Sequence, residues 1–196
     1  MVPAMRFLPA LLVSIAALAA APALAADSTV SIGDNFYDPS TSGANQNDTI
    51  TWSWDGSADH TVTSNSHQID SFHSGIKTGP GKSFKHTFKY SGRFRYFCEI
   101  HPTEMQAVVT VGTDDHVAPK LSGLKASATK VKFKVSERSV VTVKVKGSKK
   151  VVKTVGPGRH SIKFKKKLKA GRHKLSLSAK DGFGHAGKKS KRFRTH

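Results

Sequence analysis

The chain has 196 residues, of which 37% are hydrophobic, and a formal net charge of +19 at pH 7. Its length suits about two domains after a leader segment. Its single cysteine excludes a disulfide within the chain, so the domains must be held together by their cores alone.

The first residues have the pattern of an export signal. Arg6 supplies a positive charge, residues 7–21 are almost uninterruptedly apolar, and Pro22-Ala23-Leu24-Ala25 ends in small residues. We therefore expect residues 1–25 to be a cleaved signal peptide. The apolar run is short for a membrane span. We expect an exported bacterial protein, secreted or associated with the cell envelope, whose mature chain has no transmembrane span.

Charge divides the remaining chain into two parts. Residues 27–117 contain six Lys or Arg and eleven Asp or Glu, a balance of −5, whereas residues 118–196 contain twenty-five and two, a balance of +23. Such asymmetry indicates a domain boundary. We predict one domain at 27–112, a polar linker at 113–118 and a basic domain at 119–196.

The first of these domains shows strand-like alternation and no helical period. Short runs of β-branched and aromatic residues lie between Gly, Asn, Asp and Pro, which predicts half-buried strands in an antiparallel sandwich. The clearest runs are 29–32, 49–52, 83–88 and 107–111. Two segments interrupt the pattern, 55–66 and 101–105, and both contain histidines.

The only cysteine lies beside the second of these segments. A lone cysteine is usually a small buried hydrophobic residue. Here, however, Cys98 ends a strand and is followed by His101 and Met105 in a tight loop, and His60 lies at the end of another predicted strand. A thiolate, a thioether and two imidazoles are the donors of a mononuclear copper electron-transfer site. If these four residues converge, the chain is a redox protein.

Further motifs occur around these residues in a fixed order. They are Asn35-Phe36-Tyr37-Asp38-Pro39, Asp48-Thr49-Ile50-Thr51-Trp52, Asp59-His60-Thr61-Val62-Thr63-Ser64, Phe72-His73-Ser74-Gly75-Ile76, residues 80–88 and residues 92–102. Through them the segment from 29 to 111 resembles the cupredoxins, the small blue copper proteins of the plastocyanin, pseudoazurin, amicyanin and halocyanin type. The resemblance implies a Greek-key β-sandwich and one type 1 copper ion, with His60, Cys98 and His101 as equatorial ligands and Met105 as the axial ligand.

Two features depart from the family pattern. Three residues separate His101 from Met105, where the family commonly has two or four, and one of them, Glu104, is an oxygen donor poorly suited to reduced copper. Trp54 stands where related sequences often carry an Asn that pins the ligand loops together. An indole donates one hydrogen bond and accepts none, so it cannot take that role in full.

The remaining histidines of this domain favour a carrier over an enzyme. His67, His73 and His86 have no cysteine or second histidine at ligand spacing, so we expect surface or structural roles for them. The chain has no His-x-His pair, which a multicopper oxidase or copper nitrite reductase would need. We therefore expect no catalysis, and transient redox partners that dock near His101, where Ile100, Pro102 and Phe36 would form an apolar patch.

The basic domain also reads as an all-β sandwich. Alternating runs at 131–135, 140–146, 162–165 and 173–179 are separated by glycine-containing turns. The pieces 118–121, 168–175 and 179–184 resemble the immunoglobulin-like or fibronectin-like modules appended to bacterial exported proteins.

Lysines occupy alternate strand positions of this domain. A charged outer face can serve only to prevent aggregation at sheet edges. The balance of +23, however, is larger than solubility requires, and such a positive surface attracts polyanions. We expect anionic cell-wall polymers or lipid head groups as partners. We expect no nucleic acid, because Phe133, Phe164 and Phe183 lie where a core requires them and leave no stacking surface.

These observations predict an exported type 1 copper protein that carries single electrons and is held at the envelope by a basic sandwich. Two alternatives stay open. One is a copper-storage or envelope-adhesion protein without redox turnover, and the other is a degenerate cupredoxin without metal. The presence of all four ligands favours the first reading.

Overall fold

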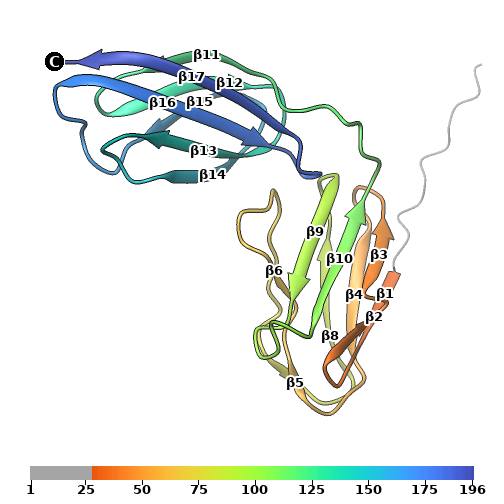
Figure 1. Ribbon diagram of the computed structural model, residues 1–196. Coiled ribbons are helices and arrows are strands. Elements are labelled where there is room, and N and C mark those ends of the chain that lie inside the picture. Colours follow the sequence, from red (N-terminus) through yellow and green to blue (C-terminus); the bar gives the residue numbers. More distant parts are fainter. Residues whose placement is uncertain (1–27) are drawn as a thin grey trace, which may run out of the picture.

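A computed structural model describes residues 28–196, and the expected signal peptide, residues 1–25, lies outside them. The described residues form seventeen β-strands and no helix (Figure 1), which confirms the all-β prediction. Accordingly, no helix in this part of the chain is long and apolar enough to cross a membrane. Strands β1 to β10 pair only among themselves, as do β11 to β17, so the sheets form two separate groups.

The first group packs two four-stranded sheets face to face. One has the order β2 (Phe36–Asp38), β1 (Ser28–Gly33), β4 (Thr49–Trp54) and β8 (Lys82–Thr87). The other has the order β3 (Thr41–Ala44), β10 (Gln106–Val111), β9 (Gly92–Phe97) and β6 (Thr63–Ser64). A short ladder joins β5 (Asp59–His60) to β7 (Lys77–Thr78) at one end of the sandwich.

The prediction of an antiparallel sandwich is confirmed for most strand pairs of this domain and was wrong for two of them. Strand β1 pairs with β4 in parallel, and β3 pairs with β10 in parallel. The chain leaves the first sheet after β2, crosses to the other sheet as β3 and returns as β4. The residue alternation that predicts a strand gives no information about such crossings, because it is the same in parallel and antiparallel pairs.

Aromatic side chains dominate the core of the first sandwich. Alternation along β4 buries Ile50, Trp52 and Trp54 and leaves the residues between them partly exposed. The Trp52 ring stacks on Phe72 with 5.5 Å between centroids and meets Tyr96 edge-on at 5.5 Å. Such pairs add about 0.5–1.5 kcal/mol beyond the area that they bury. The strands of this sandwich thus enclose a closely packed aromatic core.

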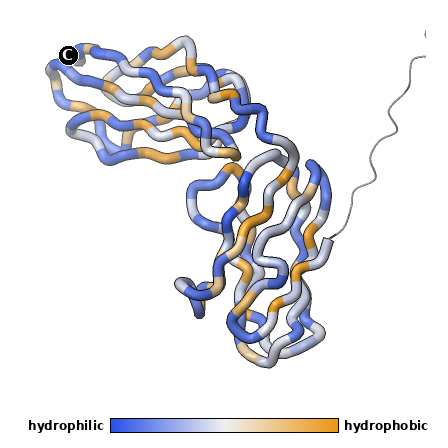
Figure 2. The backbone as a smooth tube through the Cα atoms, turned by 45° about the vertical axis from the view of Figure 1, so that its right-hand side comes forward, coloured by the Kyte–Doolittle hydropathy of each residue, from blue (hydrophilic) through white to orange (hydrophobic). Residues whose placement is uncertain are grey.

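The second group is an antiparallel sandwich of seven strands. Its three-stranded sheet has the order β11 (Leu121–Ala126), β12 (Lys130–Val135) and β15 (Gly158–Lys163). Its four-stranded sheet has the order β14 (Val151–Val155), β13 (Ser139–Val145), β16 (Gly171–Lys180) and β17 (Ala186–Thr195). Hydrophobic and hydrophilic residues alternate along these strands (Figure 2), with aliphatic side chains inside and lysines outside.

The two sandwiches contact each other at the end of the first one that lies away from β5 (Figure 1). The backbone N–H of Arg93 donates to the carbonyl of Gly182 at 2.9 Å. The guanidinium of Arg138 lies 3.9 Å from the centre of the Tyr90 ring, and its Nε donates to the Ile69 carbonyl at 2.9 Å. These contacts hold the second domain against the end of the first that is opposite β5.

Candidate metal centre

A single loop presents Cys98, His101 and Met105. Cys98 follows β9 and Met105 precedes β10, and these two strands pair from Phe97 and Gln106 onward. The Cys98 N–H donates to the Met105 carbonyl at 3.0 Å, and the Met105 N–H donates to the His101 carbonyl at 3.0 Å. The backbone of Met105 therefore closes the loop. The three residues between His101 and Met105 form a turn that ends at this hydrogen bond to His101.

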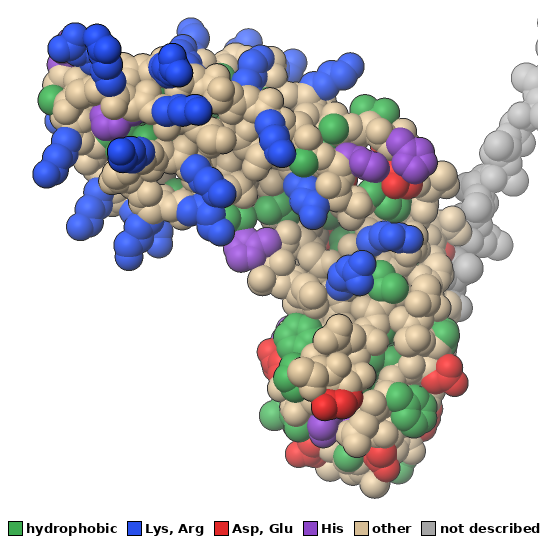
Figure 3. All heavy atoms as spheres, viewed as in Figure 1, with side chains coloured by type: hydrophobic (Ala, Val, Ile, Leu, Met, Phe, Trp, Pro, Cys, Tyr) green, Lys and Arg blue, Asp and Glu red, His purple; other side chains and the backbone are tan. Residues whose placement is uncertain are grey.

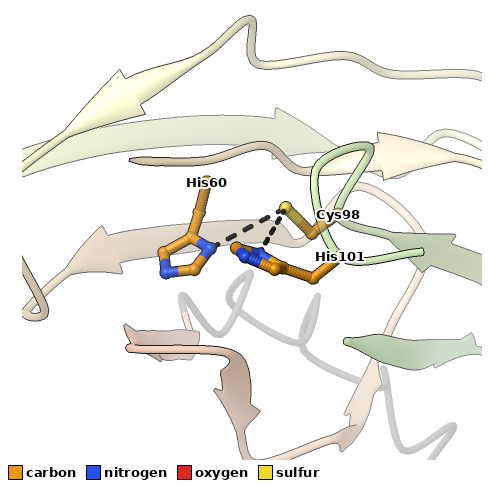
Figure 4. Close-up of side chains that lie close together, drawn as sticks. All are labelled: His60, Cys98 and His101. Carbon is orange, nitrogen blue, oxygen red and sulfur yellow. Dashed lines mark hydrogen bonds between the residues drawn. The ribbon is translucent and has the colours of Figure 1, made fainter. Parts of the chain in front are cut away.

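His60 joins these residues from the end of β5. Its Nδ1 atom lies 3.8 Å from the sulfur of Cys98, and the Nδ1 atom of His101 lies 3.8 Å from the same sulfur. Figure 4 shows the two rings directed toward the thiol. His60 and Cys98 are fully buried, and His101 is partly exposed. The three residues form one of two groups in the described chain with the geometry to hold a metal ion.

The spacing of these donors fits a trigonal ion. Metal bonds of about 2.0 Å to an imidazole nitrogen and about 2.3 Å to a thiolate, the lengths known for zinc, place the donors about 3.7 Å apart at an angle of ~120°. Both observed separations are 3.8 Å. Soft sulfur combined with two imidazoles selects copper among the common metals. The residues present therefore fit one type 1 copper ion.

Met105 is the fourth ligand predicted from the sequence. Its side chain is buried, with 1% exposure, in the same core cluster as Cys98. The neighbouring carboxylate of Glu104 is exposed, and hydrogen bonding from Thr103 keeps its pKa below the usual range. Glu104 is absent from the metal-binding group, so the thioether remains the candidate for the axial position.

Thr61 is a site residue that the sequence analysis missed. Its N–H donates to the Cys98 sulfur at 3.4 Å, and its Oγ1 accepts the N–H of Glu99 at 2.9 Å. Its carbonyl accepts the hydroxyl of Tyr37 at 2.5 Å. Groups that bond to a ligand in this way fix its orientation and tune the metal. Its place directly after His60 was the available signal.

Trp54 does not link the ligand loops. It is fully buried among the core residues, and within residues 28–196 its Nε1 has no hydrogen-bond partner. Thr61, through its bonds to the Cys98 sulfur and the Glu99 N–H, connects the segment after β5 to the loop after β9.

Burial also adjusts the protonation of the site. Desolvation lowers the pKa of His60, and the nearby His101 lowers it further. A metal ligand must be a neutral imidazole, so both effects keep His60 ready to bind. Burial raises the pKa of Tyr96 to about 12, and Tyr37 is shifted upward for the same reason, so both phenols stay neutral beside the site.

The three histidines for which surface or structural roles were expected lie apart from this group. His73 contacts the Glu99 carboxylate at 3.0 Å, His86 contacts Asp70 at 3.3 Å, and the ring of His67 contacts the hydroxyl of Ser66 at 3.0 Å. None of them belongs to a metal-binding group among the described residues.

The comparisons with known proteins concern the same part of the chain. Residues 25–112 match the family described as copper binding proteins of the plastocyanin/azurin family. No curated protein matches the chain. Among solved structures, a purple cupredoxin from Nitrosopumilus maritimus is 26% identical, covering 43% of this chain and 99% of its own, with a TM-score of 0.39.

Amicyanin structures give similar values. A mutant in its reduced state is 22% identical over 43% of this chain and 80% of its own, with a TM-score of 0.39. Another mutant, in the reduced Cu(I) form at pH 4, is 22% identical over 48% and 87%, with a TM-score of 0.40.

The sandwich and the two-nitrogen, one-sulfur donor set define the first domain as a mononuclear copper-binding module. The sequence match to copper binding proteins at 25–112 covers this same domain.

Proposed function

We propose that this chain is an exported type 1 copper protein that transfers single electrons. The observation that carries the proposal is the convergence of the Cys98 sulfur with the Nδ1 atoms of His60 and His101, at 3.8 Å each. His60, Cys98, His101 and Met105 would hold the ion, and bound copper would supply one-electron chemistry through its two oxidation states.

The residues around the donors restrict movement. His60 is held in the short β5–β7 ladder. The Cys98 sulfur accepts the N–H of Thr61, and the Cys98 N–H donates to the Met105 carbonyl. A site whose donors are fixed by the protein rearranges little between oxidation states, which favours rapid electron transfer. Burial of Cys98 and Met105 keeps water away from the two sulfur atoms.

The exposed part of the site lies at the end of the molecule remote from the second domain. His101 is partly exposed, and the large apolar side chains of Phe36, Ile76 and Ile100 are 52%, 65% and 42% exposed. Phe36 and Ile100 belong to the patch expected from the sequence. We propose that redox partners dock here through a small transient interface and exchange electrons at the His101 ring.

The second domain would act as an electrostatic anchor. Lys and Arg side chains cover the visible face of its sandwich, whereas acidic side chains gather at the copper end of the first domain (Figure 3). Lysines on β12 alternate with buried residues, and the two lysines of β16, Lys174 and Lys180, are exposed, so the charge points outward. We propose that this surface attaches the protein to anionic wall polymers or lipid head groups and leaves the copper end free.

Reconstitution tests the copper assignment. Addition of Cu(II) to the mature protein should produce an intense blue thiolate-to-copper band at one equivalent. Cys98→Ser should abolish the band, and His67→Gln, an exposed histidine outside the site, should retain it. A colourless wild type, or a band that survives Cys98→Ser, contradicts the assignment.

Binding to envelopes tests the anchor separately. Retention of the mature protein on isolated bacterial envelopes should be strong at low ionic strength and fall steeply as salt is added, because exposed charges are screened. Retention that does not depend on salt contradicts an electrostatic anchor and leaves the copper assignment untouched.

A further inference from the structure

A second group of metal-type donors lies at the junction of the two domains. It consists of Asp114 and His116 in the linker and His185 in the turn that connects β16 to β17. Nε2 of His185 lies 2.8 Å from Oδ1 of Asp114, and Nδ1 of His116 lies 3.5 Å from Oδ2 of the same carboxylate. Figure 3 shows histidine side chains beside an acidic one at this junction.

Hydrogen bonds fix the backbone of the two segments that carry these side chains. The Asp181 carboxylate accepts the N–H groups of Gly184 and His185, at 2.6 and 2.9 Å, and so fixes the turn that carries His185. Oδ1 of Asp114 also accepts the N–H of His116 at 2.8 Å. His116 has a φ of 56°, a left-handed conformation that is uncommon outside glycine, and this folds the linker back beside Asp114.

The spacing suits a small divalent ion. Two donors at about 2.0–2.1 Å from a tetrahedral ion lie about 3.3–3.4 Å apart. The nearest pairs here are 2.8 and 3.5 Å apart, and one ligand atom from each of the three residues lies within 4.8 Å of the others. An ion pair between His185 and Asp114 would account for one histidine only. The second histidine, on a different segment, converges on the same carboxylate.

We propose that Asp114, His116 and His185 form a second metal site that binds Zn²⁺ through two imidazoles and one carboxylate, with the fourth position left to water. Two nitrogen donors and one oxygen donor without sulfur match zinc and lack the soft ligands that select copper in its reduced state. The side chains of Asp114 and His185 are 30% exposed and that of His116 is 81% exposed, so an ion can enter directly from solvent.

Such an ion would connect two parts of the chain. Asp114 and His116 belong to the segment between β10 and β11, and His185 belongs to the second sandwich. Zinc binding would therefore tie the linker to that sandwich and add to the contacts that already fix the domains. The site is independent of the copper centre, because the two groups share no residue.

Zinc titration of the mature protein and its histidine variants tests the proposal. The number of Zn²⁺ ions bound, measured by equilibrium dialysis and calorimetry, should fall by one in His116→Gln and in His185→Gln, or the affinity of that ion should fall at least tenfold. His196→Gln, at the end of the chain that lies away from the junction, is the control and should bind as the wild type (Figure 1). Zinc that binds at the copper site contributes equally to the wild type and to each variant, so it does not affect the difference in the number of ions bound.

A second readout keeps the test independent of folding. His116 lies in the linker and is mostly exposed, so its variant should have the wild-type circular dichroism spectrum. In copper-loaded protein, Co²⁺ should give weak tetrahedral d–d bands without a thiolate charge-transfer band, and His116→Gln should remove them. Equal zinc binding by the wild type and both variants overturns the proposal.

Discussion

The two sandwiches of this chain differ in their cores, their charge and the parts that carry unusual residues. The first has an aromatic core, carries a balance of −5 from 27 to 117 and brings two histidines and a cysteine together at one end. The second has a mainly aliphatic core and a balance of +23 from 118 to 196. In the first domain the interior and the end loops are specialised, whereas in the second the specialised part is the outer face.

This difference indicates how function can be divided within one chain. A metal site needs fixed donors, and the large interlocking rings beneath it supply stiffness. An electrostatic surface needs only outward charge on a stable sheet, which alternating Lys and Val provide. The copper end therefore depends on packing, and the basic domain depends on the charge of its surface.

The largest expected effect comes from the aromatic core. Trp52→Ala should destabilise the first domain by about 3–5 kcal/mol, because it removes a fully buried ring that contacts several others. It should also weaken or abolish the blue copper band. Phe133→Ala in the second core is the matched control: it should destabilise that domain in denaturant unfolding and leave the band in place. Loss of the band in both variants would show that the domains are not separable in this way.

Removal of the Thr61 hydroxyl should produce the next largest effect. Thr61→Val keeps the side-chain shape but leaves the Glu99 N–H without its acceptor, so copper affinity should fall about 10–100-fold. Competition with a copper chelator measures this loss. Thr49→Val removes a hydroxyl that bonds to Thr87 across β4 and β8, and this variant should retain wild-type affinity. Equal affinities in the two variants would show that the Thr61 hydroxyl does not support the copper site.

A substitution at Gly182, where the two domains approach closely, should have a smaller effect that is confined to the domain contact. A Cβ at Gly182 would clash with the Ser91 carbonyl oxygen, so Gly182→Ala should push the domains apart. Protection of the Arg93 amide against hydrogen exchange should fall, because this N–H donates to Gly182. Gly156→Ala, where a Cβ meets nothing within 4 Å, is the control. Unchanged protection in Gly182→Ala would contradict the docked arrangement.

The smallest effect concerns a carboxylate near the junction. Burial raises the pKa of Glu137, and Asp181 and Asp115 raise it further. The folded chain thus binds this proton more tightly than the unfolded chain, and stability falls as pH rises from the unfolded pKa through the raised folded pKa. Glu137→Gln should gain about 0.5 kcal/mol or less at pH 7 and lose the gain below the unfolded pKa of about 4.3.

Urea unfolding at pH 7 and at pH 4 measures this difference. Glu104→Gln is a suitable comparison, because Glu104 is exposed and its pKa is shifted in the opposite direction. If Glu137→Gln raises the free energy of unfolding equally at both pH values, the gain does not come from the raised pKa of Glu137.

The features that depend on residues close together in the sequence could be predicted. Alternation predicted the strands, and the run from Cys98 to Met105 placed three ligands on one loop. The parallel pairing of β1 with β4 escaped prediction because alternation does not record strand direction. The role of Thr61 depends on a contact across 37 residues, to the Cys98 sulfur. The approach of His185 to Asp114 spans 71 residues and arises only when the second domain docks.

Redox titration of the reconstituted mature protein tests the central claim most directly. If the first domain is an electron-carrying copper site on a rigid support, the blue band should appear with one Cu(II) per chain. It should then disappear on one-electron reduction and return in full on reoxidation over repeated cycles without loss of copper. Copper that binds without the band, or that leaves the protein on reduction, would contradict the claim.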